Sequence, residues 1–219
     1  MNKKKLERVT PDQLESFPLY RELPNGRKLV FIHINKTGGT SVRSALGLPA
    51  EEDWRGRFRK HYRYNELLKI LPTNVLHEAT IATIVRNPWD RLVSLFHYRK
   101  WLTKSKGLEP AILAIYASFP HWFNYLWEKD QFRKPNIKPQ ISWLCDDQGQ
   151  ECVDFIGKFE NLEQDTHRLS ELLGISPLKF PHLIKSTRNP DYRSYYTPEL
   201  REKVAHLYRA DIERFDYHF

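Results

Sequence analysis

Short apolar runs alternate along this chain with longer stretches in which apolar residues recur at helical spacing. Residues 29–34 (LVFIHI), 80–85 (TIATIV) and 152–156 (CVDFI) are rich in β-branched and other apolar side chains, which predicts three buried strands. A helical pattern follows each run. Strands that alternate with helices predict an α/β fold, in which helices flank a central parallel sheet. Ligands bind such a sheet at the carboxyl ends of its strands.

Capping residues predict where two of the helices begin. Asn87 and Pro88 suit the N-cap and the first helical position, and Thr197 and Pro198 repeat this pair near the end of the chain. The last helix has one apolar face, formed by Leu200, Val204, Leu207, Tyr208 and Ile212.

Glycines and a proline predict where other helices end or bend. Gly47 and Gly174 follow helical patterns and are expected just beyond the last turn. Residues 111–128 predict one further helix, which is interrupted or bent near Pro120.

The composition fits one folded domain. The chain has 219 residues, of which 40% are hydrophobic and six are Trp, enough for a core without disulfide bonds. We expect a single domain over residues 1–219, with residues 1–27 as a partly irregular N-terminal extension. No apolar run reaches the roughly 18 residues of a membrane span, and the basic N-terminus lacks the apolar segment of a secretory signal. Cys145 and Cys152 form neither a CxxC pair nor a disulfide framework, so we expect reduced thiols in a cytoplasmic protein.

An excess of basic residues narrows the choice of partners. The 35 Lys and Arg residues exceed the 27 Asp and Glu residues, for a net charge of +8. This charge favours an anionic partner, such as a nucleotide, an acidic glycan, a nucleic acid or a membrane surface. Histidines and cysteines cluster nowhere at the spacing of metal ligands, so we expect no metal site.

The strongest local signal lies between the first predicted strand and its helix. In FIHINKTGGTS, residues 31–41, a buried strand leads into a lysine, two glycines and three hydroxyl residues, which predicts a P-loop-like strand–loop–helix that binds a phosphate. A glycine-rich corner without a ligand is the alternative. The lysine precedes the glycines, whereas a Walker A loop has the reverse order. The residues expected to bind the anion are Lys36, Thr37, Gly38, Gly39, Thr40 and Ser41.

A second candidate site follows the strand at residues 80–85. Arg86 comes directly after this strand, and Ser94 lies on the same face of the following helix as Asn87 and Arg91. A guanidinium group and a hydroxyl group that converge can bind a phosphate. An ion pair between an arginine and Asp90 or Asp12 is the alternative, and this segment alone favours the ion pair.

The two segments together resemble a known family. FIHINKTGGTS is similar to the 5′-phosphosulfate loop, and TIVRNPWDRLVSLFHY to the 3′-phosphate motif, of the sulfotransferase family that includes heparan sulfate 2-O-sulfotransferase and many bacterial enzymes. The strong resemblance covers residues 29–99, and a weaker one runs through VDFIGKFENLEQD and residues 185–215. The chain has Asn35 where relatives most often have proline.

The resemblance implies transfer of a sulfo group from 3′-phosphoadenosine 5′-phosphosulfate (PAPS) to a hydroxyl or amine, without a metal. It implies that Arg86 and Ser94 bind the 3′-phosphate. Residues 185–188, with Ser186 and Arg188, look like the late loop that closes over the nucleotide and precedes Tyr192 and Arg193; a solvated basic loop is the alternative. The residues implied to hold the 5′-phosphosulfate are Thr37, Gly38, Gly39, Thr40 and Ser41.

The resemblance also implies a catalytic base. Relatives have a histidine that precedes a helix between the two motifs, which corresponds to His61, and an imidazole suits proton removal near neutral pH. His33 is the second candidate, although its strand position favours a packed side chain. Lys36 is the natural group to stabilise charge on the leaving phosphate oxygen.

A basic stretch surrounds His61. Its cations, interleaved with Trp54, Phe58 and Tyr62, suit an acidic or carbohydrate acceptor, although a solvated basic face is the more usual meaning of such a run. The cations are Arg55, Arg57, Arg59, Lys60 and Arg63.

Two other functions compete with sulfo transfer. A basic nucleic-acid-binding domain fits the net charge but leaves both motifs unexplained. A metal-dependent phosphotransferase requires a different order of motif residues. The acceptor and the oligomeric state are not readable from the sequence, and we expect no nucleic acid partner. Golgi relatives carry a membrane anchor that this chain lacks, which favours a bacterial-type cytoplasmic enzyme.

Overall fold

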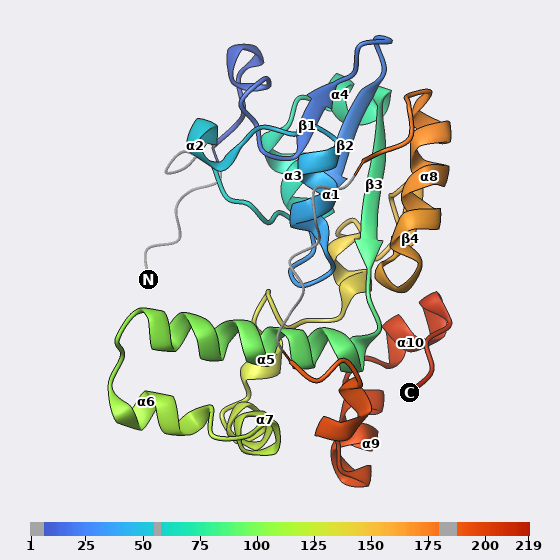
Figure 1. Cartoon of the computed structure of the whole chain (residues 1–219). Helices are drawn as coiled ribbons and strands as arrows, with labels where there is room; N and C mark the ends of the chain where they lie inside the picture. Colours follow the sequence, from blue (N-terminus) through green and yellow to red (C-terminus); the bar gives the residue numbers. More distant parts are fainter. Residues whose placement is uncertain (1–6, 55–57, 180–187) are drawn as a thin grey trace. The chain divides into compact units, whose positions relative to one another are not determined.

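The computed structural model describes residues 7–54, 58–179 and 188–219, and Figure 1 traces them. The chain divides into two compact units. The first, here called the sheet unit, contains residues 1–85 and 140–183; the second, the helical unit, contains residues 86–139 and 184–219. Each unit therefore combines two separate stretches of the chain. Within the described residues, no helix has both the length and the apolar character that crossing a membrane requires.

A four-stranded sheet with the order β1-β2-β3-β4 organises the sheet unit. Its strands are β1 (Tyr20–Glu22), β2 (Lys28–Ile32), β3 (Ala79–Val85) and β4 (Phe155–Lys158). β3 pairs in parallel with both β2 and β4, so the carboxyl ends of these three strands lie at one edge. The α/β class and the parallel centre were predicted correctly. The short edge strand β1 is antiparallel to β2, which makes the whole sheet mixed.

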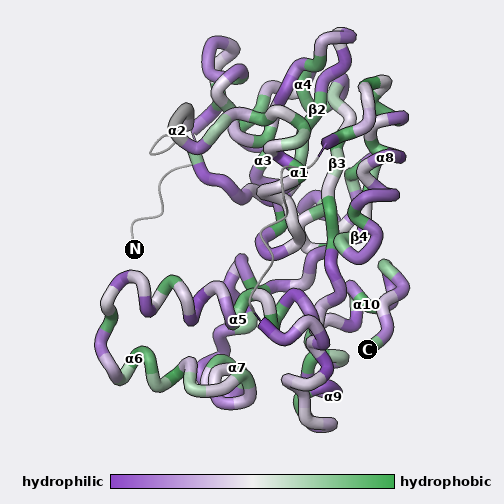
Figure 2. The backbone as a smooth tube through the Cα atoms, viewed as in Figure 1, coloured by the Kyte–Doolittle hydropathy of each residue, from purple (hydrophilic) through white to green (hydrophobic). Residues whose placement is uncertain are grey.

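Helices α1 and α8 cover one face of this sheet. Alternate residues of β2 and β3, among them Phe31 and Ile84, pack with Val42 of α1 and Leu169 of α8 in one buried cluster. Figure 2 shows hydrophobic colour on β3 and mixed colours along α8, as expected for a buried strand and a half-covered helix. The helices of the sheet unit are η1 (Pro11–Gln13), α1 (Gly39–Ala45), α2 (Glu51–Trp54), α3 (Tyr64–Ile70), α4 (Thr73–Glu78), η3 (Gln140–Trp143), η4 (Phe159–Asn161) and α8 (Leu162–Leu173).

The long helix α5 is the centre of the helical unit. Asn87 caps it as predicted, because its side chain accepts a hydrogen bond from the Trp89 amide at 3.1 Å. Helices α6, α7 and α9 all contact α5. The helices of this unit are α5 (Pro88–Ser105), α6 (Pro110–Ile115), α7 (Phe119–Glu128), η2 (Gln131–Arg133), η5 (Tyr192–Tyr195), α9 (Pro198–Leu207) and α10 (Arg209–Phe215).

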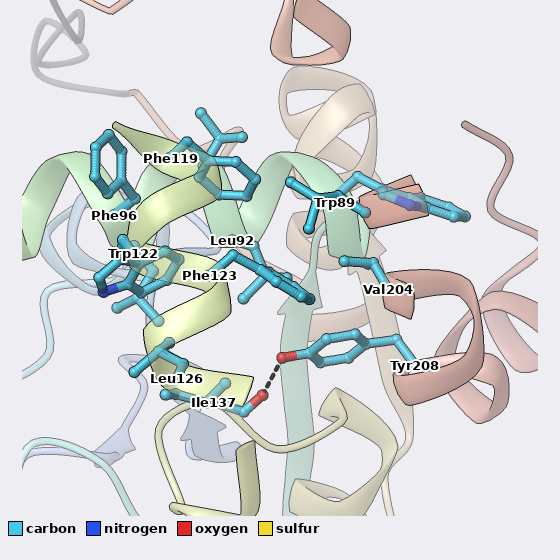
Figure 3. Close-up of a cluster of buried hydrophobic side chains, with 13 residues drawn as sticks. Trp89, Leu92, Phe96, Phe119, Trp122, Phe123, Leu126, Ile137, Val204 and Tyr208 are labelled. Carbon is cyan, nitrogen blue, oxygen red and sulfur yellow. Dashed lines mark hydrogen bonds between the residues drawn. The ribbon is translucent and has the colours of Figure 1, made fainter. Parts of the chain in front are cut away.

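Aromatic side chains from α5, α7 and the end of α9 form the core of the helical unit (Figure 3). Trp122 is fully buried, and the Tyr208 hydroxyl donates to the main-chain carbonyl of Ile137 at 2.5 Å. This bond joins the end of α9 to the segment after α7, as the dashed line in Figure 3 shows. The phenol is completely enclosed, so the bond to Ile137 satisfies a polar group that burial would otherwise penalise.

The helix expected over 111–128 is interrupted near Pro120 as predicted: it forms α6 and α7, and Pro120 lies in the first turn of α7. Other predicted boundaries were wrong. The first predicted strand, 29–34, ends at Ile32. The last helix is interrupted at Tyr208, whose φ of −113° and ψ of 23° lie outside the helical region. The third predicted strand, 152–156, begins at Phe155 instead.

Candidate active site

The predicted phosphate loop connects β2 to α1 in the sheet unit. Lys36 has a φ of 69° and Gly38 a φ of 79°, so the chain passes twice through the left-handed region. A Cβ on Gly39 would lie 2.2 Å from Cδ2 of His33, which requires a glycine there. The loop geometry therefore needs both glycines. This need is common to a phosphate-binding loop and to a glycine-rich corner without a ligand.

The hydroxyl groups of the loop differ in their contacts. Thr37 is buried and its hydroxyl donates to the main-chain carbonyl of Ile34 at 2.9 Å, which closes the loop on itself. Thr40 is exposed, and its hydroxyl accepts a hydrogen bond from Lys60 Nζ at 3.2 Å. Ser41 is half-buried on the first turn of α1. Thr40 and Ser41 thus remain the hydroxyls on the accessible side of the loop.

Lys60 brings a second ammonium group to the loop. Burial lowers its pKa, and the nearby Arg43 guanidinium lowers it further. Sequence analysis placed Lys60 in one basic stretch with the arginines around it. In the structure, Lys60 and two of these arginines contact different partners. Arg59 pairs with Glu66 at 3.0 Å and lies 4.4 Å above the Tyr62 ring, and Arg63 contacts the same Glu66 carboxylate at 3.6 Å.

These contacts correct the picture of a uniform basic stretch. Glu66 neutralises much of the charge of its two arginine partners, so among the described cations of this stretch Lys60 is the one that contacts the phosphate loop. Arg55 and Arg57 lie outside the described residues.

The two candidate histidines lie side by side in the sheet unit. His61 Nδ1 lies 2.6 Å from the main-chain carbonyl oxygen of His33, and the two ring centroids are 4.5 Å apart. A carbonyl can only accept, so the bond requires a proton on Nδ1 of His61. In a neutral His61 with this hydrogen bond, Nε2 is the unprotonated nitrogen of the ring.

His33 itself is 3% exposed and packs against Gly39 at the start of α1. Burial holds the pKa of its imidazole well below the ordinary value, and two neighbouring groups that can carry positive charge, His61 and Lys60, lower it further. The expectation of a packed side chain is correct, and the side chain supports the phosphate loop.

In the helical unit, Arg86, predicted to bind the 3′-phosphate, and Arg188, predicted to belong to the late loop, share the carboxylate of Asp90. Arg86 donates from Nε and Nη2 to Asp90 Oδ2 at 2.9 and 2.6 Å, and Arg188 donates to Asp90 Oδ1 at 2.5 Å. Arg86 and Asp90 are 6% and 9% exposed. Ser94 is half-buried one helical turn beyond Asp90, on the same face of α5. The ion pair that the sequence offered as an alternative therefore exists, and it is buried.

Other predicted residues of this unit have structural contacts. Arg91 is buried and donates to the carbonyls of Lys138 and Asn136 at 3.1 and 3.3 Å. The Tyr192 hydroxyl accepts from Asn87 Nδ2 at 3.3 Å, and the exposed Arg193 stacks 4.9 Å above the Tyr192 ring. Ser186 lies outside the described residues.

Comparison with known proteins decides the family. The model of the sulfotransferase family matches residues 25–218. The chain belongs to the sulfotransferase family. This finding confirms the resemblance based on the two motifs, because the match includes the phosphate loop and the Arg86 segment. As a sulfotransferase family member, the chain also aligns over 70 residues at 34% identity with mouse carbohydrate sulfotransferase 11, over 29% of this chain and 20% of that relative. The chain thus matches only a fifth of the length of that curated relative.

The fold of this sulfotransferase family member is similar to a solved structure. The crystal structure of mouse sulfotransferase SULT7A1 complexed with PAP superimposes with a TM-score of 0.52 and 16% sequence identity, over 92% of this chain and 87% of that chain. The likeness confirms the predicted fold class.

The contacts of two residues in the candidate site were not predicted from the sequence. Asp90 was considered only as an ion-pair partner, although it lies four residues after Arg86, in the first turn of the predicted helix. Lys60 was included in a basic stretch, and no sequence signal connects it to Thr40, twenty residues earlier.

Proposed function

We propose that this protein is a PAPS-dependent sulfotransferase that transfers a sulfo group to a hydroxyl of a carbohydrate acceptor. The family match over residues 25–218 carries the proposal, because it includes both phosphate-binding motifs in their order along the chain. The mouse SULT7A1 structure is a complex with PAP, adenosine 3′,5′-bisphosphate, and this complex supports the identity of the donor nucleotide.

Each unit, considered by itself, contains residues that suit a phosphate group of the donor. In the sheet unit, the backbone amides of the phosphate loop and the hydroxyls of Thr40 and Ser41 bind the 5′-phosphosulfate, with Lys36 and Lys60 as cations. In the helical unit, Ser94 and the two arginines on Asp90 bind the 3′-phosphate. Asp90 orients both guanidinium groups and leaves a net positive charge on the cluster, which suits a phosphate dianion.

His61 acts as the base in this proposal. The acceptor oxygen forms a bond to sulfur while the bond between sulfur and the bridging phosphate oxygen breaks, and PAP leaves. The acceptor proton passes to Nε2 of His61, the nitrogen that the bond to the His33 carbonyl leaves unprotonated. Lys36 stabilises the charge that develops on the bridging oxygen, as its position in the loop suits.

The proposal also specifies the chemical class of the acceptor, a carbohydrate. The name of mouse carbohydrate sulfotransferase 11 supports it. The net charge of +8 adds to this support, since an acidic glycan is among the anionic partners that such a charge attracts.

Calorimetric titration with PAP in the presence of EDTA tests the donor site. Wild type is expected to bind PAP, and Arg86→Ala is expected to weaken binding by about 10- to 100-fold, since a hydrogen-bonded charge contributes about 1.5–3 kcal/mol. Arg209→Ala is the matched control, because Arg209 is an exposed arginine that pairs with Glu213 on α10. A folded wild type that does not bind PAP would overturn the proposal.

Two further measurements on the wild-type protein distinguish sulfo transfer from the competing functions. A metal-dependent phosphotransferase would lose its activity in EDTA, and a nucleic-acid-binding domain would bind DNA or RNA with a steep dependence on salt. We expect sulfo transfer to persist in EDTA.

A further inference from the structure

A cavity in the helical unit has lining residues other than those of the Arg86–Asp90–Arg188 cluster. Its volume is about 410 Å³, within the roughly 300–1,000 Å³ typical of small-molecule sites. Three segments line it: the middle of α5 with Phe96, His97 and Lys100; residues 117–120, where α7 begins; and residues 194–197, which precede α9.

The floor of the cavity is aromatic and closely packed. Phe96 and Phe119 are 3% and 2% exposed, and their rings meet edge to face with centroids 5.7 Å apart. Tyr196 packs on Phe119 at 4.9 Å, and its hydroxyl donates to the Trp89 carbonyl at 2.8 Å. The half-buried rings of Tyr195 and Tyr196 also line the cavity, and partly exposed aromatic surface of this kind packs against the C–H faces of a sugar ring.

The ionisable residues on the wall of the cavity are basic. Lys100 Nζ lies 5.6 Å above the Phe96 ring, and His97 Nε2 lies 3.0 Å from the Tyr195 hydroxyl. Among the described residues that line the cavity, none is acidic. Burial lowers the pKa of His97, and the charges of Arg188 and Lys100 lower it further, so the ammonium group of Lys100 is the main positive charge on this wall.

Hydroxyl groups form part of the rim. Ser118 accepts a hydrogen bond from the His121 amide at 3.2 Å, and Thr197 accepts one from the Leu200 amide at 3.3 Å. These bonds use hydroxyl oxygens as acceptors and leave each hydroxyl proton able to donate. The rim can therefore hydrogen-bond the hydroxyls of a sugar.

We propose that this cavity binds an acidic sugar residue of the acceptor, with the sugar ring against the aromatic floor and its carboxylate or sulfate on Lys100. The inference rests on the proposed function, because it assigns the acceptor class of the same enzyme. The charge of the wall selects an anion, and the apolar floor with its hydroxyl rim selects a saccharide over a free inorganic ion.

Direct binding tests the proposal without knowledge of the natural acceptor. The probes are a tetrasaccharide that contains glucuronic acid, the same tetrasaccharide with its carboxyl groups reduced, and a sulfated form of the reduced one. Calorimetry measures affinity, and the NMR signals of the His97 ring report occupation of the cavity. We expect the two acidic forms to bind and to shift the His97 signals, and the reduced form to bind about tenfold more weakly. The ratio between the two acidic forms identifies carboxylate or sulfate as the preferred group.

Two pairs of variants locate the binding. Lys100→Met is expected to weaken binding of the acidic forms about tenfold, whereas Lys104→Met, an exposed lysine one turn further along α5, changes it less than about twofold. Ala117→Trp, which fills the rim, is expected to abolish binding, and Ala114→Trp on the exposed side of α6 to leave it intact. All four variants are expected to bind PAP like wild type.

Three results would overturn the proposal: equal binding of the acidic and reduced forms, equal effects of the two Lys→Met variants, or no saccharide binding by a protein that binds PAP. Saccharide binding by a protein that does not bind PAP would instead remove the proposed sulfo transfer and leave the cavity as a saccharide site.

Discussion

His61 donates a hydrogen bond from Nδ1 to the main-chain carbonyl of His33 over 2.6 Å. The bond selects one tautomer of the imidazole and leaves Nε2 as its basic nitrogen. Because the acceptor is a backbone atom, any side chain at position 33 can supply it. The geometry at His61 and the packing of the His33 ring can therefore be tested separately.

His61→Asn is expected to remove the base and to keep the bond to the His33 carbonyl, since an Asn amide donates from a position close to that of Nδ1. We expect kcat to fall by about 10²- to 10⁴-fold and the affinity for PAP to stay within about twofold. Steady-state kinetics with PAPS and calorimetry with PAP measure the two effects. His77→Asn, an exposed histidine on α4, is the control. A kcat close to that of wild type would exclude His61 as the base.

The buried His33 makes stability depend on pH. Its pKa in the folded protein is well below the ordinary value, so the unfolded chain binds the proton more readily. The free energy of unfolding is therefore expected to fall as the pH drops below about 6.5, by at most about 1.4 kcal/mol per pH unit. His33→Gln is expected to flatten this dependence. Denaturant unfolding at pH 5, 6 and 7 measures it, and identical slopes for variant and wild type would refute the assignment.

Gly39 and His33 are coupled by close packing. Gly39→Ala places a Cβ 2.2 Å from the His33 ring, and we expect it to destabilise the protein by about 1–3 kcal/mol and to weaken PAP binding. His33→Ala removes the obstructing ring, so the double variant is expected to lose less stability than the sum of the single ones. A double-mutant cycle by chemical denaturation measures the coupling; strict additivity would contradict it.

Asp90 balances two arginines within the helical unit. Asp90→Asn leaves Arg86 and Arg188 without their shared carboxylate, and we expect a loss of about 3–5 kcal/mol in the free energy of unfolding. PAP would restore an anion to the arginines, so PAP is expected to raise the melting temperature more in this variant than in wild type. Asp130→Asn, which breaks an exposed pair with Arg133, is the control and is expected to change stability by less than about 1 kcal/mol. Equal stability of both variants would argue against the balancing role.

Lys60 adds a positive charge beside the phosphate loop. Lys60→Met is expected to weaken PAP binding about tenfold, because its ammonium reaches Thr40. Lys69→Met is the matched control, since Lys69 is an exposed lysine paired with Asp147. Calorimetry with PAP measures both, and equal affinities would place Lys60 outside the donor site.

Local patterns in the sequence predicted most of the fold. The caps at Asn87 and Thr197 were correct because a cap depends on residues within one helical turn. The third strand begins later than its apolar run, because Asp154 bonds to Ile81 through both its backbone and its side chain before the strand starts. The edge strand β1 has only three residues, and its pairing with β2 depends on tertiary contacts.

The parts of the site formed by consecutive residues were predictable from the sequence. The contacts between residues far apart in the sequence were not. The loop from Lys36 to Ser41 is one sequence signal. By contrast, Asp90 and Arg188 are 98 residues apart, and His33 and His61 are 28 apart. No periodicity or propensity relates such pairs, so their contacts follow only from the folded chain.

Transfer of the sulfo group itself tests the central claim most directly. Wild type is incubated with PAPS and an oligosaccharide that contains glucuronic acid, in EDTA, and the products are separated and identified by mass spectrometry. The account predicts PAP together with a sulfated oligosaccharide in equal amounts, and neither product from His61→Asn above its background. Folded wild type that binds PAP and yields no sulfated product from any of a panel of acidic and neutral oligosaccharides would contradict it.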